Sequence, residues 1–172
     1  MNLLIAALGF AAERHRNQRR KDAEASPYVN HPIALANVLA NEAGIEDEST
    51  LIAALLHDTI EDTEATEAEL VQRFGQEIST MVLEVTDDKS LPKADRKRLQ
   101  IEHAPHLSRR AKRVKLADKI CNLRDIARSP PTDWTIERRR EYFDWAQAVV
   151  DQLRGVHAGL ERIFDQAYQQ RP

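Results

Sequence analysis

Apolar residues recur every three or four positions along most of this chain, which is the spacing of one buried face of an α-helix. The clearest case is the segment 108–128, in which Leu116, Ile120, Leu123 and Ala127 keep this interval. The strict alternation of apolar and polar residues that marks a half-buried strand does not occur. The pattern therefore predicts an all-α protein.

Residues that start or stop helices divide this pattern into separate elements. Thr66 and Glu69 have the spacing of a capping box, Pro92 suits a first helical turn, and Gly75 and Pro105 each suit a helix end. We expect helices over the ranges 3–12, 32–44, 51 onward, 66–74, 78–85, 92–103, 108–128, 136–153 and 156–168.

An ionisable cluster directly follows the apolar run 51–56. It begins with the adjacent pair His57 and Asp58, and Glu61 and Asp62 come one turn later. If the helix continues through this cluster, residues four positions apart share a face, so the polar groups converge on the rim of a buried segment. Burying them without partners is costly, whereas a divalent cation binds both imidazole nitrogen and carboxylate oxygen. The cluster therefore predicts a metal site, with carboxylates left over to manage a water molecule.

A polar arc lies on the predicted helix 108–128, beside its apolar face. Lys115, Asp118, Asn122 and Asp125 follow one another at intervals of three or four residues, which gathers them on one side. The spacing alone leaves two interpretations open. The arc faces a functional site, or it faces bulk water, as most charged residues of amphipathic helices do.

Composition narrows the class of protein. The 172 residues are 42% hydrophobic and 31% charged with a net charge of −3, which suits one soluble domain over 1–172 and neither a disordered nor a nucleic-acid-seeking chain. The five glycines match neither a P-loop nor a dinucleotide fingerprint. The single cysteine, Cys121, cannot form an internal disulfide, and the apolar start at 3–12 is too short to span a membrane. We therefore expect a cytoplasmic protein without membrane or nucleic-acid partners.

Histidine and aspartate residues in a fixed order connect these motifs to a known family. An early histidine, His31, is followed by the adjacent pair His57 and Asp58 and then by a distant aspartate, Asp118. In this order the chain resembles the HD phosphohydrolase superfamily, and more specifically the hydrolase domain of RelA/SpoT proteins of the small stand-alone metazoan type. The matching stretches are RRKDAEASPYVNHP (19–32), AALLHDTIEDT (53–63), EVTDDKSLPK (84–93), VKLADKICNLRD (114–125) and EYFDWA (141–146).

The resemblance implies an HD-domain helical bundle with hydrolytic activity. It implies Mn²⁺-dependent removal of the 3′-pyrophosphate of (p)ppGpp, which returns GDP or GTP plus pyrophosphate in the turnover of the stringent-response alarmone. By matching position, it implies one ion per chain and the following site residues. The metal ligands would be His31, His57, Asp58 and Asp118, the catalytic carboxylates Glu61 and Asp62, and the substrate-binding residues Arg20, Lys21, Asn122 and Tyr142.

Physical chemistry supports a metal-assisted reaction at these residues. Two imidazoles and two carboxylates leave room on a six-coordinate ion for water and a phosphoryl oxygen. One turn beyond the ligands, Glu61 and Asp62 can accept or position the proton of that water, and our hypothesis is that Glu61 contributes more. Arg20 and Lys21 supply the cationic partners that a pyrophosphate needs.

The ligand types leave the metal and the substrate open. The same donors accept Mn²⁺, Fe²⁺, Co²⁺ or Zn²⁺. One alternative is an HD phosphohydrolase that acts on another phosphorylated nucleotide, such as NADPH. Another is a nucleotide-binding regulator without turnover, against which the intact Glu61 and Asp62 argue. The assembly state also stays open.

Four histidines lie outside the matching motifs: His15, His103, His106 and His157. We expect structural roles for them on the surface or in the core. His15 precedes the basic segment that contains Arg20 and Lys21, so its surroundings matter most.

Overall fold

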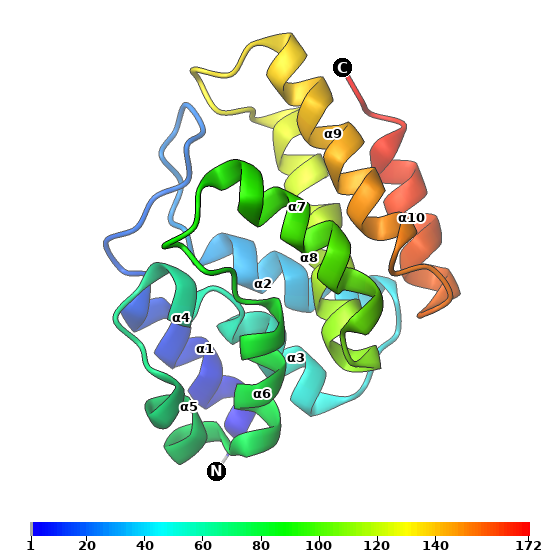
Figure 1. The fold of residues 1–172 in the computed structure, drawn as a ribbon. Helices are drawn as coiled ribbons and strands as arrows, with labels where there is room; N and C mark the ends of the chain where they lie inside the picture. Colours follow the sequence, from blue (N-terminus) through cyan, green and yellow to red (C-terminus); the bar gives the residue numbers. More distant parts are fainter. Residues whose placement is uncertain (1) are drawn as a thin grey trace.

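The computed structural model describes residues 2–172 of the chain, and the regular secondary structure in these residues is helical, with loops between the helices (Figure 1). The α-helices are α1 (Leu3–Arg14), α2 (Asn30–Asn37), α3 (Glu48–Leu56), α4 (Thr59–Asp62), α5 (Glu67–Phe74), α6 (Gln76–Val85), α7 (Lys93–His103), α8 (Arg109–Arg128), α9 (Ile136–Asp151) and α10 (Ala158–Tyr168). The π-helical turn η1 (Val38–Glu42) follows α2, and the 3₁₀ turn η2 (Ala104–His106) follows α7. The β-type pairing found in this part of the chain is an isolated bridge between Arg19 and Pro27. The prediction of an all-α protein is confirmed.

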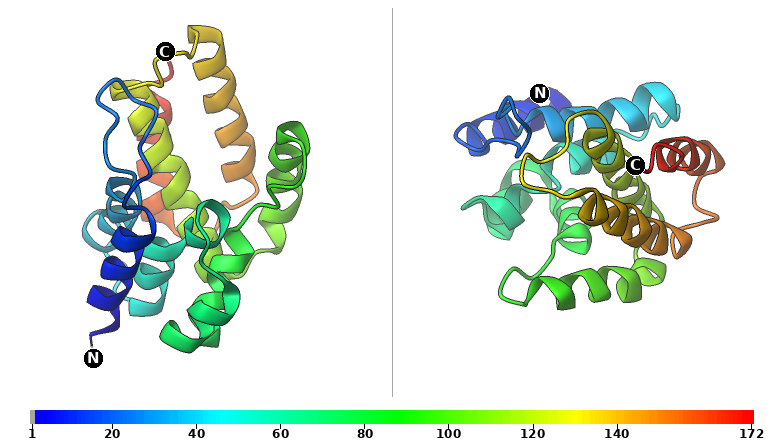
Figure 2. Two further views of the ribbon diagram at one scale, coloured as in Figure 1. Left: turned by 90° about the vertical axis from the view of Figure 1, so that its left-hand side faces the viewer. Right: turned by 90° about the horizontal axis from the view of Figure 1, so that it is seen from above.

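Helix α8 forms the centre of the bundle. It contacts α2, α3, α6, α9, α10 and η1, and it runs between the N-terminal helices and the α9–α10 pair (Figures 1 and 2). Leu116, Ile120 and Leu123, whose spacing predicted this helix, are fully buried. An apolar stripe of this kind stabilises a helix that several neighbours share. Because α8 touches elements from both ends of the chain, its polar residues lie where several helices meet.

The helix boundaries follow the capping residues. Thr66 accepts a hydrogen bond from the backbone N–H of Glu69 (3.2 Å), and Ser108 accepts one from Ala111 (3.2 Å), so α5 and α8 begin where predicted. Gly75 ends α5 with a φ of 89°, which glycine adopts without steric cost. Helices α7, α9 and α10 lie over their predicted ranges, with ends that differ by one or two residues. None of the helices described in residues 2–172 combines the length and apolar character that crossing a bilayer requires.

The expectation that one helix continues through the ionisable cluster is wrong. Asp47 caps α3, so this helix begins before its predicted start, and it ends at Leu56. His57 and Asp58 form a turn, and the short helix α4 starts after them at Thr59. The backbone of Asp58 has φ −102° and ψ 0°, which lies in the bridge region outside the α-helical range.

Side chains of the turn itself explain why the helix stops. The His57 ring donates a hydrogen bond to the carbonyl oxygen of Ala54 (2.8 Å), and the Thr59 hydroxyl donates to the carbonyl oxygen of Leu56 (2.7 Å). These carbonyls belong to the last turn of α3 and would otherwise need backbone N–H donors from a continuing helix. The side chains therefore terminate α3 directly before the acidic pair.

The segment predicted over 32–44 is also divided. Helix α2 begins at Asn30, ahead of Pro32, and gives way after Asn37 to the π-helical turn η1. Proline is tolerated in the first helical turn because the N–H groups there have no partner within the helix. Gly44, with a φ of 67°, follows η1 and marks the predicted end of the segment.

Leu56 is fully buried at the end of α3, directly before the His–Asp pair. The variant Leu56→Ala leaves a cavity, and we expect the free energy of unfolding to fall by about 2–5 kcal/mol. Urea unfolding followed by circular dichroism measures this change. Ile5→Ala is the matched control, because Ile5 is 62% exposed and its truncation should change stability by less than about 0.5 kcal/mol. Equal losses in the two variants would contradict this account of the core.

Candidate metal centre

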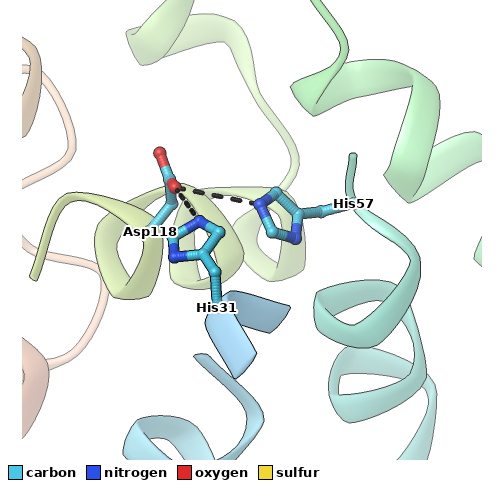
Figure 3. Close-up of side chains that lie close together, drawn as sticks. All are labelled: His31, His57 and Asp118. Carbon is cyan, nitrogen blue, oxygen red and sulfur yellow. Dashed lines mark hydrogen bonds and ion pairs between the residues drawn. The ribbon is translucent and has the colours of Figure 1, made fainter. Parts of the chain in front are cut away.

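Three side chains from distant parts of the chain converge at one place. His31 is on α2, His57 follows the last residue of α3, and Asp118 is in the middle of α8. One ligand atom of each lies within 4.8 Å of those of the other two (Figure 3). Both histidines are buried, and the Asp118 side chain is 15% exposed. The structure thus brings together three of the four residues predicted as metal ligands.

Asp58, the fourth predicted ligand, adjoins this group. Its Oδ2 atom lies 2.9 Å from His57 Nε2 and 3.9 Å from His31 Nε2. Asp118 Oδ1 lies 3.1 Å from His31 Nε2 and 3.8 Å from His57 Nε2. Ligand atoms about 2.1 Å from a common ion are separated by about 3.0 Å when they are neighbours at right angles and by about 4.2 Å when they are opposite. These separations therefore fit a divalent cation.

The orientation of His57 also suits a metal ligand. Because Nδ1 donates to the carbonyl of Ala54, Nε2 is the atom that faces the carboxylates. Within residues 2–172 this buried Nε2 has no aligned hydrogen-bond partner, although Asp58 lies close to it. The Tyr28 hydroxyl donates a hydrogen bond to the same carboxylate atom, Asp58 Oδ2.

Asp118 is held by two neighbours on its own helix. Asn122 Nδ2 donates a hydrogen bond to Asp118 Oδ1 (2.8 Å), and Lys119 Nζ lies 3.2 Å from Asp118 Oδ2. Lys119 is buried, and its ammonium group lies 4.2 Å from the centre of the Trp145 ring. This cation–π contact keeps the lysine in place. Asp118 therefore presents Oδ1 to the two histidines.

The charges in this cluster favour a cation. Burial disfavours the charged form of His57, but the Asp58 carboxylate outweighs it and raises the pKa of His57 to about 9. Burial likewise disfavours the charged form of Asp58, yet His57 holds the pKa of this carboxyl below its usual range. Carboxylates that draw a proton onto a neighbouring imidazole also draw a metal ion, which binds in place of that proton.

Two cavities meet at this centre. The first has a volume of about 270 Å³ and the second a volume of about 620 Å³. Five residues line both cavities: Tyr28, His31, Asn122, Trp134 and Tyr142. Basic residues line the first cavity (Lys93, Arg96, Lys97, Lys115 and Lys119) and the second (Arg19, Arg20, Lys21 and Lys89). Both cavities therefore offer basic groups beside the His–Asp cluster. Acidic residues also line the first cavity (Asp58, Glu61, Asp87 and Asp118) and the second (Asp22, Asp62 and Asp125).

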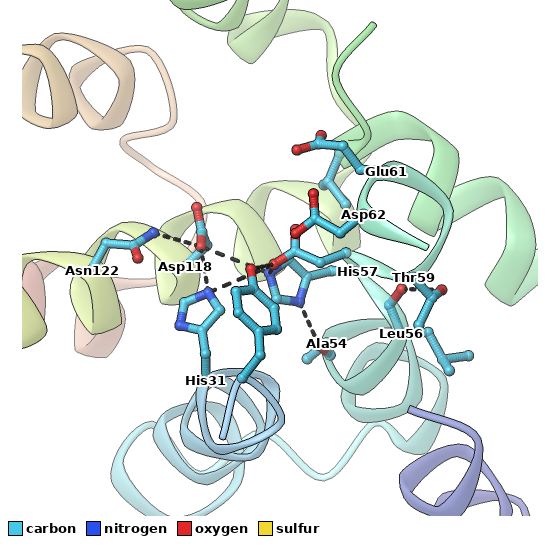
Figure 4. Close-up of polar contacts among 12 residues, drawn as sticks. His31, Ala54, Leu56, His57, Thr59, Glu61, Asp62, Asp118 and Asn122 are labelled. Atoms are coloured by element: carbon cyan, nitrogen blue, oxygen red, sulfur yellow. Dashed lines mark hydrogen bonds and ion pairs between the residues drawn. The ribbon is translucent and has the colours of Figure 1, made fainter. Parts of the chain in front are cut away.

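Glu61 and Asp62 are adjacent in sequence but line different cavities. Both lie on α4 beside the His–Asp cluster (Figure 4). Glu61 lines the first cavity, where its Oε1 atom accepts a hydrogen bond from the backbone N–H of Asp87 (2.6 Å). Asp62 lines the second cavity and accepts hydrogen bonds from Gln18 Nε2 (3.0 Å) and Lys89 Nζ. The separate helix α4 thus directs the two carboxylates to different neighbours.

Burial changes the acid–base behaviour of Glu61. It raises the pKa of this carboxyl to about 7, although the hydrogen bond from Asp87 acts in the opposite direction. A carboxyl group in this range exchanges a proton near neutral pH.

All four residues predicted to bind substrate line the second cavity: Arg20, Lys21, Asn122 and Tyr142. Arg20 donates to Asp125 Oδ2 (2.7 Å) and Asn122 Oδ1 (3.3 Å), which ties the basic segment to α8. Lys21 is exposed. The role of these residues in binding stays a prediction.

The cavities also decide between the two interpretations of the polar arc on α8. Lys115 and Asp118 line the first cavity, Asp125 lines the second, and Asn122 lines both. The arc therefore faces the two cavities, although the Asp125 side chain at its end is also 48% exposed.

Sequence reasoning missed Tyr28, Lys119 and Trp145 as neighbours of the centre. Tyr28 lies three residues before His31, inside one of the matching stretches, and that position was the available signal. Lys119 and Trp145 also lie inside matching stretches, 114–125 and 141–146, but their contact joins α8 to α9 and no local pattern reports it.

Comparisons with known proteins agree with this geometry. Residues 7–144 match the HD domain family. The guanosine-3′,5′-bis(diphosphate) 3′-pyrophosphohydrolase MESH1 of Xenopus tropicalis is 54% identical over 166 residues, which cover 96% of this chain and 93% of that protein. The Homo sapiens protein of the same name is 54% identical over 168 residues, which cover 98% of this chain and 94% of that protein.

Solved structures extend the likeness to three dimensions. A metazoan orthologue of SpoT that hydrolyses ppGpp and plays a role in starvation responses has a TM-score of 0.95 and 53% identity, covering 98% of this chain and 95% of that chain. The protein lmo0812 of Listeria monocytogenes, at a TM-score of 0.63 and 24% identity, shares the fold alone. The resemblance inferred from the sequence is confirmed, and this chain belongs to the HD domain family, in the group that contains the MESH1 proteins.

Proposed function

We propose that this protein hydrolyses the 3′-pyrophosphate of (p)ppGpp to give GDP or GTP and pyrophosphate. Relatives that are 54% identical over nearly the whole chain carry the name of this activity. The observation that carries the proposal is the convergence of His31, His57 and Asp118 where two cavities that contain basic residues meet. A nucleotide with phosphates on both sides of its ribose needs positive charge on both sides of the reacting bond.

The metal in this proposal is one Mn²⁺ ion per chain. His31, His57, Asp58 and Asp118 would hold it, because their nitrogen and oxygen donors suit Mn²⁺ among other divalent metals. The choice of Mn²⁺ comes from the resemblance to RelA/SpoT hydrolases. When bound, such an ion lowers the pKa of a water molecule and polarises a phosphoryl group.

Glu61 is the proposed acceptor of the proton of the attacking water. The N–H of Asp87 engages Glu61 Oε1, which leaves Oε2 for this task. A pKa of about 7 suits a group that takes up a proton at neutral pH and then releases it. Asp62, held by Gln18 and Lys89, is proposed to assist from the side of the second cavity.

Arg20 and Lys21 are the proposed phosphate partners in the second cavity. A pyrophosphate is well matched by a guanidinium group, which offers paired donors. Asn122 and Tyr142 are proposed to help line the nucleotide pocket. The Tyr142 ring lies 5.7 Å from that of Trp134, and an aromatic wall of this kind supports stacking with a purine base.

The direct test is turnover by purified protein from which metal has been stripped. We expect no release of pyrophosphate from ppGpp or pppGpp by the stripped protein, and recovery when Mn²⁺ is added back. Parallel samples with Zn²⁺ and Mg²⁺ compare the metals, and the stripped protein must keep its helical circular dichroism. Turnover that persists without metal contradicts the role of the ion.

NADPH serves as the competing substrate in the same assay. Release of phosphate from NADPH without release of pyrophosphate from ppGpp would move the proposal to another phosphorylated nucleotide. Tight nucleotide binding with no turnover under any metal would support a regulator instead.

We also propose that the chain forms one domain that works in the cytoplasm. The buried apolar residues form one continuous core, with α8 touching helices from both ends of the chain. The support for the cytoplasm is the single cysteine, Cys121, which is buried and unpaired.

A further inference from the structure

His15, Gln18 and Asp62 form a chain of hydrogen bonds. His15 Nδ1 lies 2.6 Å from Gln18 Oε1, and Gln18 Nε2 lies 3.0 Å from Asp62 Oδ2. His15 is the residue that caps the C-terminus of α1, and it is 1% exposed. It lines neither of the two cavities, so its connection to Asp62 runs through Gln18.

The chemistry of the partners determines the direction of each hydrogen bond. A carboxylate only accepts hydrogen bonds, so the amide nitrogen of Gln18 faces Asp62 and its oxygen faces His15. That oxygen also only accepts, so His15 Nδ1 carries the hydrogen. The chain of donors therefore runs one way, from His15 through Gln18 to Asp62.

The other ring nitrogen of His15 shows that packing alone does not explain this residue. His15 Nε2 is buried and has no hydrogen-bond partner within residues 2–172. An unpaired buried polar atom lowers stability, and an apolar side chain of similar size would fill the same space without that cost. The donor at Nδ1 is the property that only a polar side chain supplies here.

The same segment also supports the Asp58 side of the centre. The His15 ring lies 4.9 Å from the ring of Tyr28, whose backbone N–H donates to the carbonyl oxygen of Gln18 (3.0 Å). The Tyr28 hydroxyl donates to Asp58. His15 thus contacts both Gln18, which bonds to Asp62, and Tyr28, which bonds to Asp58.

We propose that His15 is a positioning residue for the reaction, acting on Asp62 through Gln18. Without the amide of Gln18, Asp62 keeps Lys89 as its partner, and the Lys89 side chain is 50% exposed. The carboxylate would then be held by an exposed lysine alone, whereas His15 and Gln18 hold it against the buried end of α1. The inference rests on the proposed function, because it requires that Asp62 takes part in turnover.

Two substitutions of His15 separate its donor from its volume. The variant His15→Leu fills the space without a donor, whereas the amide nitrogen of His15→Asn can take the place of Nδ1–H. We expect His15→Leu to lower kcat for ppGpp by about 10-fold, with KM changed by less than about twofold. We expect His15→Asn to recover most of this loss.

The variant Gln18→Met tests the second link of the chain. It keeps the length of the side chain and removes both polar atoms, so kcat should fall about as far as in His15→Leu. Because both changes break one chain, the double variant should lose little more than either single variant. Losses in kcat that multiply would overturn the inference.

His157→Leu is the matched control. His157 Nδ1 accepts a hydrogen bond from the N–H of Leu160 (3.2 Å) and caps α10, far from Asp62 in sequence and outside both cavities. Its loss should lower the melting temperature and leave kcat per folded molecule unchanged. Thermal unfolding of every variant separates lost structure from lost turnover.

Asp62→Asn, measured beside these variants, distinguishes the failure of this inference from that of the proposed function. If Asp62→Asn is impaired and His15→Leu is normal, or if His15→Asn fails to recover activity, the positioning role is wrong and the proposed function stands. If Asp62→Asn has normal turnover, the proposed role of Asp62 is wrong and the positioning role of His15 is wrong with it.

If the unaltered protein does not hydrolyse ppGpp, the proposed function is wrong. The unfolding free energies of the His15→Leu, Gln18→Met and double variants then test the chain, and additive changes overturn it.

Discussion

Asp118→Asn is expected to lower kcat for ppGpp at least about a thousandfold and to remove the bound metal ion. Asp118 Oδ1 lies 3.1 Å from His31 Nε2 and 3.8 Å from His57 Nε2. Asparagine keeps the shape of the side chain but lacks the negative charge that attracts a divalent cation. A metal ion contributes several kcal/mol to the transition state, and about 1.4 kcal/mol corresponds to a factor of ten in rate. The measurements are kcat and the metal content per chain.

The control for this variant is Asp165→Asn on α10. Asp165 forms an exposed ion pair with Arg154 (2.8 Å) and lines neither cavity, so metal content and kcat should not change. Circular dichroism must show that Asp118→Asn is folded, because Lys119 loses its charged partner there. A folded Asp118→Asn protein that keeps one metal ion and normal turnover would show that Asp118 is not a ligand.

Glu61→Gln is expected to lower kcat by about 10²- to 10⁴-fold, the usual contribution of a general base. The amide oxygen of glutamine can still accept the hydrogen bond from the N–H of Asp87, so the side chain should keep its place. What it loses is the oxygen that takes up a proton. Metal content should stay at the level of the unaltered protein, which separates this variant from Asp118→Asn.

Asp62→Asn is expected to lower kcat at least about tenfold, which is a smaller effect than that of Glu61→Gln. Asp62 is engaged by Gln18 and Lys89 on the side of the second cavity, whereas Glu61 lines the first cavity with the full set of proposed ligands. Both variants are compared by kcat at saturating ppGpp. Near-normal turnover in Glu61→Gln together with no turnover in Asp62→Asn would reverse the two roles.

The sequence by itself determined most of the helices, because an apolar stripe and its caps are local properties. Helix α8 was predicted to within one residue, since Ser108 caps its start and Pro130 and Pro131 follow its end. The sequence also determined the family and the set of candidate ligands, because the order of His31, the His–Asp pair and Asp118 needs no coordinates to be recognised.

Only the tertiary structure decided how those residues are used. The break of the helix at His57 and Asp58 depends on short-range bonds from side chains to carbonyl oxygens three residues earlier. It is the packing of the bundle around α4 that places Glu61 and Asp62 in different cavities. The helical spacing of the sequence predicted that these carboxylates converge with His57 and Asp58 on one rim of a continuous helix. Periodicity does not report where side chains replace backbone N–H donors and end a helix.

The role proposed for His15 likewise required the packed molecule. His15 and Asp62 are joined through Gln18 because the end of α1 lies beside α4, and no local pattern records that contact. The same holds for the polar arc of α8, which looked equally suited to water and to a site. Short-range propensities decide which segments are helical, whereas contacts between residues far apart in the chain arise only when the helices share one core.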